Sequence, residues 1–147
     1  MDNKFWVVNA SPLILLSKAE SLQLLSNMSE SVIIPSVVTR EIAAKKDGLY
    51  LLEELNKYDS FLIKDEEEVP VDILAWDLGA GETQVLVYAK RYGAERVVLD
   101  DLEGRRCAKV LSVPTIGTLG IVGQTIGSVK SSTPSFRTFV STRPVRN

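Results

Sequence analysis

The feature that most constrains the fold is an alternation of two kinds of segment along the chain. Short runs rich in β-branched and aromatic residues, which are typical of strands, alternate with longer segments whose apolar residues recur at the period of a helix. The short runs lack a strict alternation of apolar and polar residues, as expected of strands buried on both faces of a parallel sheet. The order β-α-β-α-α-β-α-β-α-β predicts an α/β domain with a mostly parallel central sheet flanked by helices.

The residue types predict approximate limits for each strand and helix. The expected strands are residues 5–9, 31–35, 60–64, 95–100 and 112–117, and the expected helices are residues 11–27, 36–46, 48–58, 81–93 and 102–111. In the first helix the apolar spacing directs Leu13, Leu16, Leu22 and Leu25 to the core. A chain of 147 residues suits one domain with a core of its own.

Two residue types restrict the chemistry. The chain contains no histidine, which excludes Ser-His-Asp triads, Cys-His pairs, histidine-ligated zinc and histidine general bases. It contains one cysteine, so no intrachain disulfide can form, and we expect Cys107 to be a small buried residue in a helix. No glycine-rich phosphate-binding motif is present. Any catalysis must therefore rest on carboxylates, lysines, hydroxyl groups or metal ions.

The sequence shows no sign of membrane insertion. No apolar run reaches the roughly 18 residues that a membrane-spanning helix needs. The first ten residues lack a basic region followed by a long apolar core, so no signal peptide is expected. We therefore expect a cytoplasmic protein that makes no membrane contact.

The last 20 residues, 128–147, differ in composition from the rest of the chain. They contain four basic residues, Lys130, Arg137, Arg143 and Arg146, and no acidic residue, whereas residues 1–127 contain 13 basic and 19 acidic residues. The segment is rich in Ser and Thr and has no helical pattern. We expect a domain of residues 1–127 and a basic tail of residues 128–147, in which Phe136 or Phe139 packs against this chain or a second copy of it.

Several oxygen-bearing side chains are expected at one edge of the sheet. In open α/β sheets ligands bind beyond the carboxyl ends of the strands. The residues at those ends are Asn9 and Ser11 after the first strand, Glu41 in the helix after the second, Glu82 in the helix before the fourth, and Asp100 and Asp101 directly after the fourth. Clustered carboxylates raise each other's pKa values, and Mg²⁺ or Mn²⁺ relieves that repulsion. The cluster therefore predicts a metal site.

Each of these residues also has a structural interpretation. Asp101 could cap the following helix, and Glu82 could stabilise a helix N-terminus through the macrodipole. Glu41 could pair with Lys45 one helical turn away, and Asn9 with Ser11 could form a turn and a helix cap. Only their joint placement at one edge favours a shared function.

At these residues the sequence resembles the PIN-domain ribonucleases, and particularly the VapC-like toxins of bacterial toxin–antitoxin pairs. The matching blocks are "VVNASPLILLSKAE", "VIIPSVVTREI" and the long block from "LGAGETQVL" to "LDDLEGRRCAKVLSVPTIGTLGIV", which together cover residues 5 to about 122. The resemblance implies the PIN fold, a three-layer sandwich with a parallel sheet between helices. It also implies a metal-dependent cleavage of RNA.

The resemblance also implies roles for individual residues. Glu41, Glu82 and Asp101 match the carboxylates of the family's metal site. A shift of the alignment by one residue would put Asp100 in the place of Asp101. Asn9 stands where much of the family has Asp, so this chain has a neutral ligand in that place. Ser11 or Thr118 could hold a metal-bound water, and Lys45, Lys46, Arg105 and Arg106 could contact RNA phosphates, although solvated surface charge is the simpler interpretation of these four residues.

The function that follows is a toxin-type endoribonuclease in which water on Mg²⁺ or Mn²⁺ attacks an RNA phosphodiester. Its expected partners are RNA, an antitoxin protein and a second copy of this chain in a homodimer. One alternative is a weakly active or inactive PIN-fold binding or regulatory module, which the neutral Asn9 favours. Another alternative is a phosphatase-like α/β protein, although no Asp-x-Asp motif follows the first strand.

Overall fold

The central sheet has five parallel strands in the order β3-β2-β1-β4-β5. The computed structural model describes residues 4–130. The strands are β1 (Phe5–Val8), β2 (Ser31–Pro35), β3 (Phe61–Lys64), β4 (Arg96–Val98) and β5 (Thr115–Ile116). Every pairing between neighbours is parallel. The structure thus confirms the predicted α/β fold, a sheet flanked by helices.

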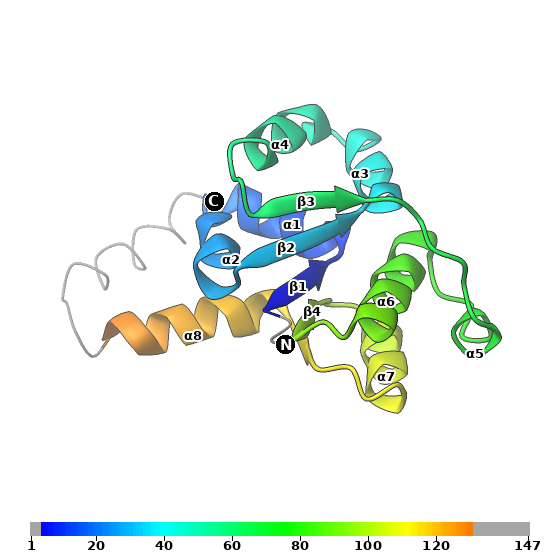
Figure 1. The fold of residues 1–147 in the computed structure, drawn as a ribbon. Helices are drawn as coiled ribbons and strands as arrows, with labels where there is room; N and C mark the ends of the chain where they lie inside the picture. Colours follow the sequence, from blue (N-terminus) through cyan, green and yellow to red (C-terminus); the bar gives the residue numbers. More distant parts are fainter. Residues whose placement is uncertain (1–3, 131–147) are drawn as a thin grey trace.

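Eight helices connect and cover the strands within the described residues. They are α1 (Ala10–Lys18), α2 (Gln23–Met28), α3 (Ser36–Ala43), α4 (Gly48–Leu55), α5 (Val71–Leu74), α6 (Ala80–Tyr92), α7 (Leu102–Val110) and α8 (Thr118–Lys130). Helix α6 packs on β1, β2 and β4 and contacts α3, α5 and α7, whereas α8 contacts α1 and α2 (Figure 1). None of the helices in residues 4–130 combines the length and the apolar character that crossing a bilayer requires.

The core lies between the sheet and these helices. The central strands contribute fully buried Val7, Val8, Val32, Ile34, Val97 and Val98. The predicted core positions of the first helical segment, Leu13, Leu16, Leu22 and Leu25, are all buried. Cys107 is buried in α7, as predicted, and burial raises the pKa of its thiol. It is therefore a neutral core residue.

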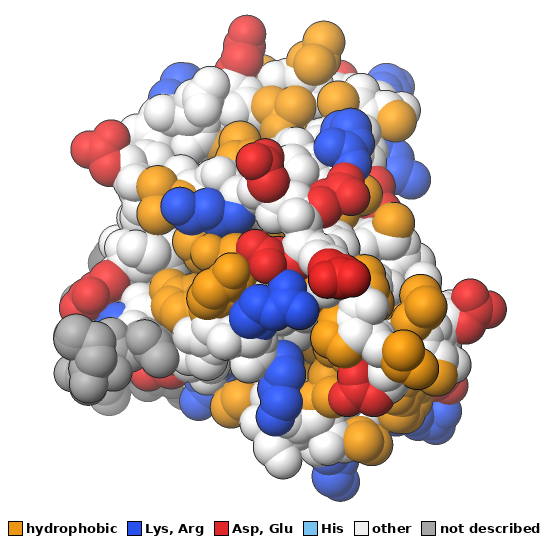
Figure 2. Space-filling view, turned by 45° about the vertical axis from the view of Figure 1, so that its right-hand side comes forward, with side chains coloured by type: hydrophobic (Ala, Val, Ile, Leu, Met, Phe, Trp, Pro, Cys, Tyr) orange, Lys and Arg blue, Asp and Glu red, His pale blue; other side chains and the backbone are white. Residues whose placement is uncertain are grey.

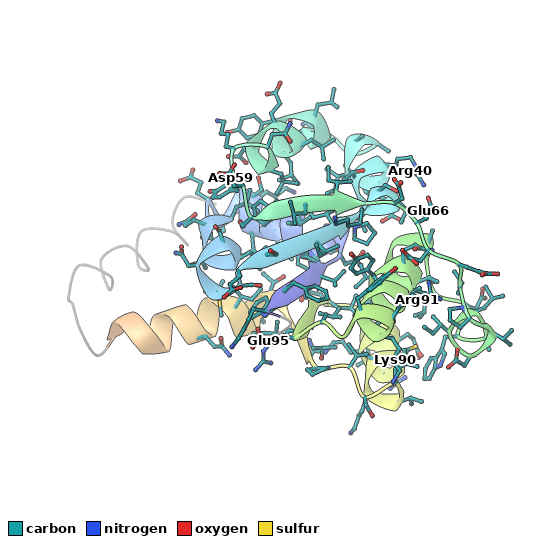
Figure 3. The ribbon with its side chains drawn as sticks, in the orientation of Figure 1. Arg40, Asp59, Glu66, Lys90, Arg91 and Glu95 are labelled. Carbon is teal, nitrogen blue, oxygen red and sulfur yellow. The ribbon has the colours of Figure 1, made fainter. Side chains whose placement is uncertain are left out.

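Charges of both signs lie side by side on one face of the molecule. Figure 2 shows Asp and Glu side chains next to Lys and Arg side chains near the middle of that face. Arg40 on α3 pairs with Glu66, which follows β3, and the two point toward one another in Figure 3. Arg91 on α6 donates to Glu67 over 2.7 Å. These ion pairs tie the loop after β3 to α3 and α6.

The structure differs from the sequence-based expectation in four elements. One is the short helix α5 (Val71–Leu74), which the sequence did not suggest. The single helix expected at 11–27 is two helices, and Glu20 between them has a positive φ of 55°. Strand β3 is an edge strand, so Leu62 and Ile63 are exposed instead of buried on both faces. Helix α8 is an addition that the sequence did not suggest, because four glycines in 117–127 lower the helix propensity of that region.

Helix α8 also bears on the expected tail. It continues through Lys130, so residues 128–130 are helical and the expected boundary after residue 127 falls inside a helix. Residues 131–147, including Phe136 and Phe139, lie outside the described residues. The division into domain and tail stays a prediction.

The turn between α3 and α4 depends on one glycine. A Cβ atom on Gly48 would lie 1.8 Å from the carbonyl oxygen of Ile42 and 2.7 Å from its carbonyl carbon, which are backbone atoms that cannot rotate away. Preceding Gly48, Asp47 has a φ of 63° in the left-handed region. The sequence "KKDG" thus makes a tight turn in which α4 closes directly against α3.

We expect Gly48→Ala to destabilise the protein by about 3 kcal/mol, because the new methyl group overlaps the α3 backbone. Thermal unfolding followed by circular dichroism measures the change. Gly123→Ala is the matched control, since a Cβ at Gly123 in α8 would meet nothing within 4 Å. The control should be neutral or slightly stabilising. Equal melting temperatures for wild type and Gly48→Ala would contradict the tight-turn interpretation.

Candidate functional site

The site begins at Asn9, the residue that follows β1. Its backbone N–H donates to the carbonyl oxygen of Val98 over 3.1 Å, which extends the pairing of β1 with β4. Asn9 is also the residue before α1, but its side chain makes no capping hydrogen bond. The residue is 8% exposed, and its Oδ1 is buried without a hydrogen-bond partner among the described residues. Such an unsatisfied acceptor costs about 1–3 kcal/mol.

Glu41 and Asn9 meet at Gly81, near the start of α6. A Cβ atom on Gly81 would lie 2.5 Å from Oε1 of Glu41 and 3.1 Å from Oδ1 of Asn9. The Gly81 N–H donates to the other oxygen of Glu41, Oε2, over 3.2 Å. Only a residue without a side chain leaves these oxygens room to share one space. Glu41 therefore faces the site, and the alternative pairing with Lys45 is not seen among the described residues.

Glu82 lies next to Asp101. The carboxyl group of Asp101 is close enough to act on the pKa of Glu82. Burial raises the pKa of Glu82, and the negative charges of Asp101 and Glu41 raise it further, while a hydrogen bond from the Gly79 N–H opposes the shift. The structural interpretation also holds, since Asp101 caps α7 by accepting the Gly104 N–H over 2.9 Å. One carboxylate thus caps a helix and borders the site.

Asp100 points elsewhere. Its two carboxylate oxygens accept from the backbone N–H and the hydroxyl of Thr118, over 2.7 Å and 2.6 Å, and so anchor the start of α8. Adjacent to this contact, Arg105 donates to the carbonyl oxygen of Leu99 over 3.2 Å. The structure therefore separates the two neighbouring aspartates, with Asp101 on the side of Glu82 and Asp100 engaged with Thr118.

A cavity opens beside these residues. It is lined by Asn9, Ala10, Ser11, Ile14, Glu41, Lys45, Gly79, Gly81 and Glu82. Of the residues that the sequence suggested for the site, the structure brings together five around this cavity: Asn9, Ser11, Glu41, Glu82 and Lys45. Lys46 lines a neighbouring cavity, Arg105 and Arg106 line a third, and Thr118 is held by Asp100.

Sequence reasoning missed the two glycines of "GAGE". Because Gly81 has no side chain, it leaves room for the oxygens of Asn9 and Glu41, and the Gly79 N–H donates to Glu82 over 3.3 Å. The signal in the sequence was the run of small residues, Gly79, Ala80 and Gly81, directly before Glu82 at the start of a helix. Such residues often indicate a close approach of the backbone to another group.

The donor set fits a divalent cation of the Mg²⁺ or Mn²⁺ type. The buried and unpartnered Asn9 Oδ1 lies beside a carboxylate, and Glu82 and Asp101 hold further charge nearby, so oxygen ligands of the preferred kind are present. Within residues 4–130, no three acidic side chains are already drawn together as a metal cage. Side-chain rotation of Glu41, Glu82 or Asp101 is needed to complete one.

The comparisons with known proteins identify the family of the chain. A family model described as a PIN domain, DUF3368, matches residues 5–131. The chain belongs to this PIN-domain family. PIN domains are a nuclease-related family and typically bind divalent metal ions. The match confirms the resemblance to PIN domains, while the toxin type stays a prediction.

One solved structure is similar to this chain. A PilT N-terminus domain protein from the hyperthermophilic archaeon Sulfolobus solfataricus P2 is similar with a TM-score of 0.48 and 13% sequence identity, over 83% of this chain and 93% of that one. Among curated proteins no match is found.

We expect Glu82→Gln to raise the melting temperature at pH 7 by about 1–3 °C in the presence of a chelator. The folded-state pKa of Glu82 is raised above its ordinary value of 4.5, so the folded state favours the protonated carboxyl group. Stability contributed by that proton is present at low pH and is lost as pH rises from 4.5 through the raised pKa. The neutral glutamine removes this loss.

Melting curves recorded between acidic and neutral pH measure the effect. The wild type should lose stability over the window above pH 4.5, and Glu82→Gln should lose less. Glu53→Gln, at an exposed position of α4, is the control for the loss of one charge and should follow the wild type. A Glu82→Gln protein that is less stable at neutral pH would show that its charge does not oppose folding.

Proposed function

We propose that this PIN domain is a metal-dependent endoribonuclease of the VapC-like toxin type, cleaving RNA phosphodiesters. The observation that carries the proposal is the buried Oδ1 of Asn9, which has no hydrogen-bond partner within residues 4–130 and faces Gly81 together with a carboxylate oxygen of Glu41. A lone acceptor beside a negative charge is unfavourable unless a cation binds both.

Glu41, Glu82 and Asp101 would hold the cation together with Asn9. When bound, Mg²⁺ or Mn²⁺ polarises a phosphoryl oxygen and lowers the pKa of its bound water. The chain's own residues set the position of each ligand. Gly81 holds Glu41 through its N–H, and Gly104 holds Asp101 through a helix cap. Asp100 stays a weaker candidate because both of its oxygens bind Thr118.

Two further groups border the same cavity and suit an RNA substrate. Ser11 is exposed and lines the cavity, so its hydroxyl can hold a water molecule there. Lys45 is also exposed and lines the cavity, where its ammonium group can bind the phosphate that approaches the carboxylates. A basic group at the rim offsets the repulsion between an acidic site and a polyanion.

A second candidate function is a PIN-fold binding or regulatory module without catalysis, and Asn9 favours it. An amide oxygen is a ligand for Mg²⁺, but it brings no charge, so it leaves the site with one carboxylate fewer than an aspartate would supply. The two candidates differ in whether the residual charge of Glu41, Glu82 and Asp101 is enough to hold the ion at cellular concentrations.

We expect Asn9→Asp to tighten Mn²⁺ binding by about tenfold or more, because affinity rises with the number of charged ligands. Calorimetric titration of Mn²⁺ into both proteins measures this, and cleavage of an unstructured RNA with and without EDTA measures activity. Asn56→Asp adds the same charge at an exposed position after α4 and should change neither.

The outcomes separate the two functions. Cleavage by the wild type that EDTA abolishes supports the nuclease. An inactive wild type with an active Asn9→Asp variant supports the binding module instead. Equal Mn²⁺ affinities for both proteins would show that Asn9 is not a ligand.

Gly81→Ala tests the geometry of the site without removing a ligand. The added methyl group would lie 2.5 Å from Glu41 Oε1 and 3.1 Å from Asn9 Oδ1, so the Glu41 carboxylate must move. We expect a loss of Mn²⁺ affinity of about tenfold. The melting temperature without metal should change little, because the end of the Glu41 side chain can rotate. Unchanged affinity would place the ion away from Gly81.

The partners of a VapC-like toxin are part of the proposal. We propose that this chain pairs with a cognate antitoxin protein and forms a homodimer. Light scattering of the purified chain tests the homodimer, and a monomeric mass at micromolar concentration would contradict it.

A further inference from the structure

The cavity of the acidic site continues into a second cavity of opposite charge. The second cavity, here called the lysine cleft, is lined by Ile14, Ser17, Lys18, Lys45, Lys46, Asp47, Gly48, Tyr50 and Leu51. Ile14 and Lys45 line both cavities. The lysine cleft therefore runs from the acidic site along α1 and the turn between α3 and α4.

The ammonium groups of the cleft are not neutralised by the described residues. Lys18, Lys45 and Lys46 are all exposed, and none forms an ion pair within residues 4–130. Among the described residues, the one carboxylate that lines the cleft is Asp47. In contrast, Arg106, which the sequence also suggested for RNA binding, pairs with Glu103 over 2.8 Å. The unpaired positive charge in the cleft thus suits an anionic ligand.

The two lysines of the turn are held by a rigid backbone. The Gly48 N–H donates to the Lys45 carbonyl over 3.0 Å, and the Lys45 N–H donates to the Ile42 carbonyl over 3.0 Å. The close approach of Gly48 to the α3 backbone closes the turn. A ligand that binds these lysines therefore orders their side chains but does not have to order the chain that carries them.

The cleft also carries an exposed aromatic ring. Tyr50 lines it and is 61% exposed, and the ring pairs found in the described residues do not include it. Proteins that bind single-stranded nucleic acids combine a positive groove with aromatic side chains on which bases stack. An acidic peptide would use the lysines but has no base to stack on Tyr50.

We propose that the lysine cleft binds the single-stranded RNA segment that adjoins the phosphodiester in the acidic site. Lys18 and Lys46 hold backbone phosphates, Tyr50 stacks on a base, and Lys45 bridges the two cavities. This inference rests on the proposed function, since it takes the acidic site as the place of cleavage. It adds two residues, Lys18 and Tyr50, and a path for the strand.

The test is the affinity of the full chain for a fluorescent single-stranded RNA of about ten nucleotides, a length that spans one such site. Anisotropy titrations in EDTA keep binding separate from metal-dependent cleavage. We expect the double variant Lys18→Ala, Lys46→Ala to bind about tenfold or more weakly at low salt. The plot of log affinity against log salt concentration should become less steep by about 1.4, because each lost phosphate contact reduces the magnitude of its slope by about 0.7.

Tyr50 separates RNA from an acidic protein segment as the ligand. Tyr50→Phe keeps the ring and should bind RNA as the wild type does, whereas Tyr50→Leu should bind several-fold more weakly. A polyglutamate peptide should compete poorly. Normal RNA binding by Tyr50→Leu together with effective competition by the peptide would overturn the proposal in favour of an acidic protein partner.

The control for charge is the double variant Lys57→Ala, Lys64→Ala, which removes two exposed lysines outside the cleft. It should bind RNA as the wild type does. Equal weakening by both double variants, or no weakening by Lys18→Ala, Lys46→Ala, would overturn the cleft as the binding site. Circular dichroism melting curves establish that each variant is folded.

Mn²⁺ titration of the same variants distinguishes failure of the cleft from failure of the nuclease. Lys18→Ala, Lys46→Ala should bind Mn²⁺ as the wild type does, because neither lysine is a ligand. RNA binding that depends on the cleft, without Mn²⁺ binding by the wild type, would contradict the nuclease alone. Metal-dependent cleavage with cleft-independent RNA binding would contradict the cleft alone.

Discussion

The parallel pairing of β1 with both β2 and β4 is the interaction on which the site depends. Because β1 lies at the centre of the sheet, its end meets the ends of two neighbours at one edge. The backbone hydrogen bond from Asn9 to Val98 carries this pairing one residue beyond the strand. Asn9, the helix after β2 with Glu41, and the segment after β4 with Asp101 are thereby held at the same edge.

At that edge the protein places negative charge where burial and repulsion oppose it. The pKa of Glu82 is raised first by burial and then by Asp101, and Asn9 contributes a buried oxygen to which no group in the described part of the chain donates. These features are unfavourable for folding and favourable for cation binding, as is common at functional sites. Backbone N–H groups of Gly79, Gly81 and Gly104 hold the carboxylates in place. The lysine cleft next to them supplies the opposite charge.

Much of the fold was predictable because local patterns and tertiary packing agree. The apolar spacing of Leu13, Leu16, Leu22 and Leu25 marked residues that are buried. The break at Glu20 was not predictable from that spacing, since the period continues across it. The two helices have different neighbours, because α1 contacts α3 whereas α2 contacts β2. Helix α8 was missed because its glycines argue against a helix, while contacts with α1 and α2 and the cap from Asp100 stabilise it.

By itself the sequence determined the alternation of strands and helices, the absence of histidine chemistry and the set of oxygen-bearing side chains expected at one edge of the sheet. These follow from residue types and periods, which are local properties. Only the tertiary structure decided the strand order, the exposed edge position of β3, and which of two adjacent aspartates contacts Glu82. It also decided that Asn9 and Glu41 meet beside Gly81 and that Lys18 shares a cleft with Lys46. Such contacts join residues far apart in the chain, and no local pattern specifies the distance between them.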